Sequence, residues 1–404
     1  MWIYIVRYKN MRRLLSDKII IWLLIMPLLI MSCQQQAPKV TEVIDIINKE
    51  APVKIDIYDI VDSISYIQLE TSAQCLLNDI RCAKRDGNFY FVKDRNGLFV
   101  FDGQGHFLNE IGQKGAGPNE YLYMDNFYLD HEHKLVCIIS NVQKKILRYA
   151  YCGDYHSTLK IKEEDANIQS MMPCAYGKLL GYFPLPNDAF NSKSEYSLFE
   201  LKDDLLVSER LLDAKKVKTG KAYYPFLYYP MALFDNRCFF ISVFSNELYS
   251  YDGSENLAIY DIDIPDNIPD ESFLEKHRDL DFLQLTELMS EKGIGLGITA
   301  LEATSDYLFA SVSNKSTMIW DKKQGILVAR IYNPDLNVYS DLLSGGVSDE
   351  HLGFLTADFS SEMNEEDNPI LYQYSFKKNI VEILAEKYKN GALSDIVSPQ
   401  MMKK

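Results

Sequence analysis

The chain has 404 residues, of which 47% are hydrophobic, so it is long and apolar enough to bury a large core. Its formal net charge is −15 at pH 7, and a chain this acidic repels phosphate backbones, which excludes nucleic acid as an expected partner. The charges are dispersed, and this pattern favours a solvated surface.

The first 32 residues have the pattern of an export signal. Basic residues precede an apolar run, 19–29, which is too short for a comfortable transmembrane helix. The run ends in Ile-Met-Ser-Cys at 30–33, which resembles the bacterial lipobox, so Cys33 is the predicted lipidation site. No acidic cluster follows Cys33, and we therefore expect an outer-membrane lipoprotein that faces the periplasm, with exposure at the cell surface as the alternative.

The six remaining cysteines form no C-x-x-C pair, so the sequence predicts no metal site. Cys137 and Cys238 lie in strand-like apolar runs, where a buried free thiol is the common occupant. Cys75 and Cys82 are the local pair that a periplasmic disulfide would join.

Short apolar runs separated by turn residues recur in sets of four along the chain. The third run of each set contains an aromatic residue, which marks the register. These residues are Phe101, Tyr149, Phe199, Tyr251, Trp320 and Tyr374, at intervals of about 50 residues with one longer interval. Four runs per interval, without helical periodicity between them, predict an all-β fold, a six-bladed β-propeller of four-stranded antiparallel blades. A doubly wound α/β fold would need a helix after most strands.

The ends of the chain complete this organisation. A further strand-like run, 63–69, precedes the first set, and we expect it to close the ring by pairing with the last blade. The runs of the last set are 341–347, 352–359, 370–376 and 380–384. The predicted segments are a signal peptide over 1–32, a flexible tether over 33–53, the propeller over 54–390 and a C-terminal tail over 391–404.

A glycine-rich segment, 112–121, joins the first two sets. Gly112, Gly115 and Gly117 suit positive backbone φ angles in a tight crossing, and Glu120 can accept backbone N–H bonds there. The alternative is a phosphate-cradling loop, which would need a helix directly after it.

This segment carries a family resemblance. From Ile111 to Tyr121 the sequence resembles the G-x-x-G-x-G-P-x-E-[FY] signature of NHL-type repeats. Together with Tyr-Ile-Gln-Leu-Glu-Thr at 66–71 and the lipobox, it is similar to the six-bladed β-propeller lipoproteins, NHL-like or TolB-like, of Gram-negative bacteria. The signature is complete only once. The resemblance implies a propeller fold and an envelope location, and it transfers no catalytic residue.

The lengths of the connections indicate which end of the propeller is functional. Because strands in a blade are antiparallel, links from strand two to three and from blade to blade leave by one end, and the other links leave by the opposite end. All long segments belong to the first class, and long loops on a rigid scaffold are common binding sites. They are the glycine segment, 184–195, 213–230, 265–297 and 360–369.

Three of these segments have distinct chemistry. Tyr223, Tyr224, Tyr228 and Tyr229 can offer flat amphipathic rings to a ligand, or can simply cover a junction between blades. Apolar residues recur at helical spacing between 266 and 297, which predicts a helical insertion between blades four and five. The third segment holds Glu362, Glu365, Glu366 and Asp367, which lack the alternation of a calcium loop, so we expect a solvated charge run.

The function favoured by this pattern is a binding or scaffolding module for a glycan, a peptide or an envelope protein, bound to the membrane through its lipid only. The alternative is an enzyme, such as a glycan hydrolase or lyase, with its site at the mouth of the central channel. Asp94, Arg95 and Glu247 are the candidate polar residues at this mouth, although a structural salt bridge is the favoured interpretation of Asp94 and Arg95. No cofactor is expected.

Overall fold

The computed structural model describes most of the chain that follows the predicted tether. The described residues are 40–44, 53–77, 80–162, 168–175, 178–183, 196–202, 207–213, 227, 229–254, 257–262, 268–312, 316–321, 325–333, 338–340, 347–349, 353–358 and 367–387. The predicted signal peptide, Cys33 and the C-terminal tail lie outside them.

Three sheets of four antiparallel strands come first in the chain, each in sequential order. The first contains β4 (Ile80–Asp86), β5 (Phe89–Asp94), β6 (Leu98–Asp102) and β7 (Phe107–Glu110). The second contains β8 (Asn126–Asp130), β9 (Leu135–Ser140), β10 (Lys145–Ala150) and β11 (Tyr155–Lys160). The third contains β12 (Ser170–Cys174), β13 (Lys178–Tyr182), β14 (Tyr196–Leu201) and β15 (Val207–Asp213).

Three further sheets receive strands from the N-terminal part of the chain. The fourth contains β16 (Met231–Phe234), β17 (Arg237–Ile241), β18 (Glu247–Tyr251), β19 (Leu257–Ile262) and, parallel to β19, β1 (Val40–Ile44). The fifth contains β20 (Ile298–Ala303), β21 (Tyr307–Val312), β22 (Ser316–Asp321), β23 (Gly325–Asn333), β24 (Val338–Ser340) and the parallel β2 (Val53–Asp56). The sixth contains β25 (Val347–Asp349), β26 (Gly353–Asp358), β27 (Ile370–Phe376) and β3 (Val61–Gln68).

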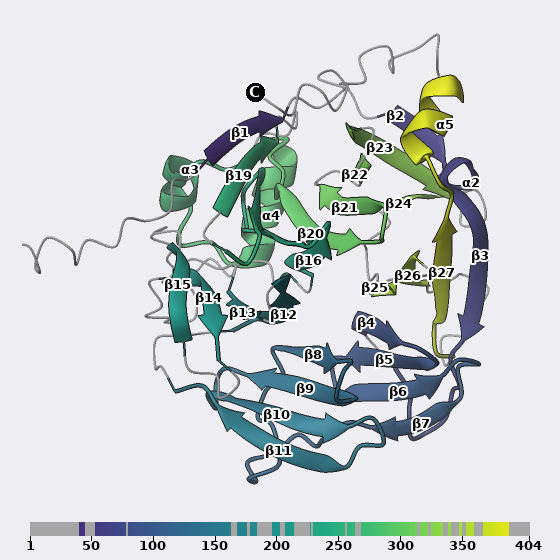
Figure 1. Cartoon of the computed structure of the whole chain (residues 1–404), viewed down its shortest axis with the longest axis vertical. Coiled ribbons are helices and arrows are strands. Elements are labelled where there is room, and N and C mark those ends of the chain that lie inside the picture. Colours follow the sequence, from purple (N-terminus) through teal and green to yellow (C-terminus); the bar gives the residue numbers. More distant parts are fainter. Residues whose placement is uncertain are drawn as a thin grey trace, which may run out of the picture. The chain divides into compact units, whose positions relative to one another are not determined.

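The sheets are arranged with their first strands innermost (Figure 1). β8 contacts β12, β12 contacts β16, β16 contacts β20, β20 contacts β25, and β25 contacts β4. Burial follows the same order, because β9 is buried along its whole length between neighbouring sheets, whereas the outer β7 alternates between half-buried and exposed. The chain is therefore an all-β propeller of small, mostly four-stranded antiparallel sheets, as the repeat predicts.

The predicted closure by residues 63–69 is confirmed. β3 pairs antiparallel with β27 from Ile370 opposite Gln68 to Phe376 opposite Val61, and Figure 1 shows the two strands side by side. The predicted last strand, 380–384, is wrong, because these residues belong to α5 (Ile380–Lys387). Ile380, Val381 and Leu384 are buried at helical spacing, and β3 already occupies the position of the fourth strand.

The structure also bears on the predicted tether and on the predicted helical insertion. The predicted flexible tether is corrected over Val40–Ile44, which forms β1. The predicted helical insertion contains α3 (Glu271–Lys276) and α4 (Phe282–Glu291), and each begins at an aspartate cap.

The cysteines bear on the disulfide considered above. Cys75 and Cys82 are both buried free thiols, so the structure does not contain the disulfide between them. Cys137 and Cys238 are buried and free as well, as the sequence predicts.

The strand bounds confirm the asymmetry of the connections. Links from strand one to two and from three to four are short, such as those at 87–88 and 103–106. The long connections, which separate β7 from β8, β13 from β14, β15 from β16, β19 from β20 and β26 from β27, all belong to the other class. We call these five segments the long connections.

Candidate functional site

The tyrosine cluster divides between described and undescribed residues. Tyr223, Tyr224 and Tyr228 lie outside the described residues. Tyr229 is only 7% exposed, and its hydroxyl oxygen lies 3.1 Å from Ala83 N, from which it accepts, and 3.3 Å from Ala83 O, to which it donates. Its own carbonyl accepts from Leu301 N at 2.8 Å. Tyr229 therefore links two inner strands that are not neighbours in the ring, β4 and β20. It acts as a core residue.

The predicted mouth residues Asp94 and Arg95 serve a turn. Asp94 is buried, its carboxylate accepts from Asn96 N at 2.7 Å, and its own N–H donates to Gly97 O at 2.9 Å. Arg95 is exposed. The carboxylate thus shapes the link between β5 and β6 in the manner of an Asx-turn.

Glu247 lies at the corresponding position of the fourth sheet, at the start of β18. Its carboxylate accepts from Tyr249 Oη and from Ser245 Oγ, the latter at 3.3 Å. Ser245 also accepts Ile298 N through its carbonyl, at 3.0 Å, where the chain enters β20. The structure does not bring Glu247 together with Asp94 in any described contact.

The glycine segment is a structural crossing, as predicted, but the predicted positive φ is found only at Gly112 and is wrong for Gly115 and Gly117. Gly112 has a φ of +69°, and a Cβ there would lie 2.9 Å from the Tyr149 ring. Glu120 accepts Gly117 N at 2.8 Å, and a Cβ on Gly115 would overlap this carboxylate. The turn is anchored to the second sheet by Lys145 Nζ, which donates to Glu120 O at 2.7 Å.

In three sheets, a polar side chain at the end of the second strand or in the link that follows it fastens the sheet to the next one. Lys93 Nζ, from β5, donates to Asp125 O at 2.8 Å, just before β8. Asn141 follows β9 and exchanges two hydrogen bonds with Ile168, of 2.7 and 2.9 Å, just before β12. Asn368 precedes β27, and its amide accepts Leu77 N and donates to Glu70 O and Cys75 O, at 2.7, 2.6 and 2.6 Å. These contacts, which we call the fastening contacts, satisfy backbone groups that the sheet ladders leave open.

Lys93 is the fastening residue that carries an ionisable side chain, and its pKa is strongly shifted. Burial lowers its pKa to about 8, opposed by the charges of Cys82 and Asp125, which raise it. Burial also raises the pKa of Asp125, whose carboxylate accepts Asn141 N at 2.8 Å. The region combines an amine that titrates close to neutral pH with a partly desolvated carboxylate.

Some exposed apolar side chains lie in links from strand two to three or from sheet to sheet, and others, such as Phe89, Tyr155 and Leu233, lie on strands. Leu122 and Tyr123 are 45% and 51% exposed between β7 and β8, and Val142 is 69% exposed between β9 and β10. Leu122 N donates to Gln143 Oε1 at 2.9 Å, so these two connections are in contact. Leu283 is 70% exposed on α4, and Leu76 is 44% exposed before β4. Leu122, Tyr123 and Val142, which we call the apolar rim, were not singled out by the sequence, because isolated apolar residues in polar loops form no periodic pattern.

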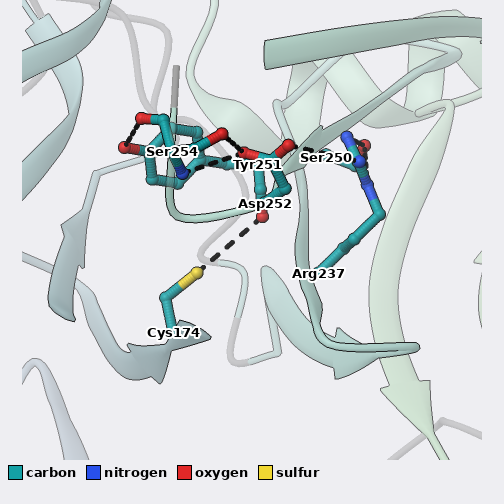
Figure 2. Close-up of polar contacts among 6 residues, drawn as sticks. All are labelled: Cys174, Arg237, Ser250, Tyr251, Asp252 and Ser254. Carbon is teal, nitrogen blue, oxygen red and sulfur yellow. Dashed lines mark hydrogen bonds and ion pairs between the residues drawn. The ribbon is translucent and has the colours of Figure 1, made fainter. Parts of the chain in front are cut away.

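The opposite end carries polar clusters tied to short turns. Figure 2 shows Arg237 reaching Ser250 from β17, while Ser254 folds back on Asp252 and Tyr251. Arg237 Nη1 lies 3.8 Å from Asp252 Oδ2, and Cys174 Sγ lies 3.8 Å from Tyr251 O. These contacts hold the turn after β18 against β17 and β12.

Asp86 forms a second cluster at this end, which sequence reasoning missed. Its carboxylate accepts Lys134 Nζ at 2.7 Å and Tyr151 Oη at 2.6 Å, and it lies 3.3 Å from His131 Nδ1. Burial by itself would raise the pKa of Asp86. The three contacts outweigh this effect and hold the pKa below its ordinary value. The cluster joins the first sheet to the second.

The described residues contain neither a membrane-spanning helix nor a metal-binding cluster. No helix among them is long and apolar enough to span a bilayer. No group of three or more histidine, cysteine or acidic residues among them is arranged to hold a metal ion.

Solved structures share the fold. A candidate exported protein of Bacteroides fragilis NCTC 9343 is 19% identical, with a TM-score of 0.59 over 84% of this chain and 99% of that one. A member of the DUF4221 family from Bacteroides vulgatus is 10% identical, with a TM-score of 0.47 over 78% and 97% of the two chains. An inactive virginiamycin B lyase from Staphylococcus aureus is 12% identical, with a TM-score of 0.47 over 77% and 99%. At these identities the likeness concerns the fold alone.

Among curated proteins, none matches the chain. A family model does match, over residues 41–396, and it spans all the sheets described above. The chain belongs to the family described as "Domain of unknown function (DUF4934)".

Proposed function

We propose that this chain is a binding or scaffolding propeller of the bacterial cell envelope, anchored through a lipid on Cys33, that engages a glycan, a peptide or an envelope protein through its long connections. In this proposal the six sheets are six blades of one ring closed by β3, and the protein is an outer-membrane lipoprotein that faces the periplasm.

The observation that carries the proposal is the position of the apolar rim. Leu122, Tyr123 and Val142 are exposed in two connections that the hydrogen bond from Leu122 N to Gln143 Oε1 joins. Exposed apolar and aromatic side chains on a rigid framework supply most of the binding energy in typical interfaces. The buried polar groups, in contrast, join sheets.

Site-specific photo-crosslinking in cells tests this proposal. A photoreactive residue at Val142 or Tyr123 should form a discrete adduct with an envelope component. A matched probe at Gln104, in the short turn between β6 and β7, should not. Adducts from Gln104, or none from either rim position, would contradict the proposal.

One observation favours an enzyme as the second candidate. Lys93, with a pKa of about 8, lies beside Asp125 at the end of β5, and perturbed pairs of this kind recur at catalytic sites. Turnover of an envelope glycan that is lost in Lys93→Met but retained in Asn96→Leu would favour catalysis. A panel of such glycans without turnover, together with rim adducts, would leave the binding function.

A further inference from the structure

The outermost strands of the sheets fall into two groups. The pairing of β7, β11, β15 and β3 with the adjacent strand is interrupted by register shifts, at Val100/Phe101, Arg148/Tyr149, several positions in β14 and Ser375/Phe376. The pairing of β19 with β18 and of β23 with β22 runs without a shift. A bulged edge is a poor template for a further strand, whereas an unbroken edge presents a regular row of N–H and C=O groups.

The two unbroken edges are the ones that carry an added parallel strand. β1 pairs with β19 from Val40 opposite Ala258 to Ile44 opposite Ile262. β2 pairs with β23 from Val53 opposite Ala329 to Asp56 opposite Tyr332. Figure 1 shows β1 beside β19 at the outer side of its sheet. Edge regularity therefore coincides with strand addition in this molecule.

The two added strands differ in how the rest of the fold holds them. β2 leads directly into α2 (Ile57–Ile60), where Ile57 and Ile60 are buried and Asp56 caps the helix by accepting Tyr58 N at 2.9 Å. β3 follows at once and closes the sixth sheet. β1 precedes this block, in the segment between Cys33 and β2, and its ladder with β19 is its defined attachment. A peptide strand held by an edge ladder is the arrangement of β-augmentation.

From these observations we propose that the outer edge of β19 is a strand-accepting site for an extended peptide segment of a partner protein, and that β1 occupies it in cis. The ligand lies parallel to β19 and resembles β1, whose sequence is Val-Thr-Glu-Val-Ile. This site is separate from the apolar rim, so it adds a second binding mode to the propeller.

The test uses the mature chain and a fluorescent peptide of residues 39–45. Thr41→Pro combined with Val43→Pro removes N–H donors from β1 and should weaken its ladder. This variant should bind the peptide at least tenfold more tightly than the natural chain. Asn48→Pro with Lys49→Pro, outside the ladder, is the matched control and should behave like the natural chain. A scrambled peptide should not bind.

Hydrogen exchange locates the binding. Residues 257–262 should lose protection in the Thr41/Val43 variant and regain it with peptide, while 325–333, at the other unbroken edge, stay protected and report an intact fold. Equal binding by variant and natural chain, or protection regained elsewhere, would overturn the proposal.

The natural chain provides a second measurement that does not depend on the variant folding. Saturating peptide should raise exchange over 40–44 while 257–262 remain protected, and the absence of this response would overturn the proposal. A natural chain that is dimeric, and that the peptide converts to monomer, would show that a second copy fills the edge and would overturn the assignment in cis.

Discussion

The buried contacts between the sheets and the exposed apolar rim use their side chains in opposite ways. Between the sheets, polar groups such as Lys93, Asn368 and the Tyr229 hydroxyl are buried and bonded to backbone groups of another sheet or of the connection that precedes it. In the connections, Tyr123 and Val142 are apolar and exposed. Buried polarity therefore does not by itself indicate a catalytic site, because joining sheets requires the same residue types.

The largest effect should come from Asn368→Leu. The substitution leaves Leu77 N, Glu70 O and Cys75 O without their buried partner, so we expect a loss of about 3–5 kcal/mol in the free energy of unfolding. Urea denaturation measures it, and exposed Asn96→Leu should stay within about 0.5 kcal/mol of the natural chain. A loss below about 1 kcal/mol for Asn368→Leu would show that Asn368 does not fasten the sheets.

Lys93→Met should change how stability depends on pH. The pKa of Lys93 is about 8 in the folded chain against 10.5 for a free lysine, so between these values the unfolded state binds more protons and stability rises with pH. The free energy of unfolding of the natural chain minus that of Lys93→Met should therefore rise from pH 8 to 10.5, by about 3 kcal/mol at most. If this difference in the free energy of unfolding stays flat or falls between pH 8 and 10.5, the pKa of Lys93 is not lowered by burial.

Tyr229→Phe distinguishes the core role of this tyrosine from a binding role. Loss of the hydroxyl leaves Ala83 N and Ala83 O unpaired, so the free energy of unfolding should fall by about 1–2 kcal/mol. Exposed Tyr155→Phe is the control. Crosslinking from Val142 should be unaffected by Tyr229→Phe. An unchanged stability together with loss of the adduct would instead make Tyr229 part of the binding surface.

The sequence predicts those parts of this fold that leave a local pattern. Four apolar runs per interval specify the strands, and the unassigned run 63–69 specifies the closing strand, because a propeller has one position for it. The run at 380–384 is too short to separate strand from helix, and only the occupation of the strand position by β3 decides it.

Long-range pairing explains the remaining differences. β1 pairs with β19 more than 200 residues away in the chain, and nothing in the sequence near Val40 reports that edge. The fastening contacts had a usable signal, since Lys93 and Asn141 each stand at or just after the end of a second strand. The apolar rim had none, because exposure of Tyr123 or Val142 depends on how two connections fold together.

The smallest effect on stability should come from the rim itself. Tyr123→Ser with Val142→Asp removes exposed apolar area and should change the free energy of unfolding by no more than about 0.5 kcal/mol per site. The same variant should lose most of its partner binding. A comparable loss of stability would place these residues in the core.

The central claim, that the apolar rim binds a partner and the buried polar contacts hold the sheets together, is tested most directly by hydrogen exchange of the mature chain with and without its crosslinked partner. The account predicts new protection over 121–123 and 141–144, and unchanged exchange over 131–134 in the short turn of the same sheet. Protection confined to 131–134, or to the end of β5 around Lys93, would contradict it.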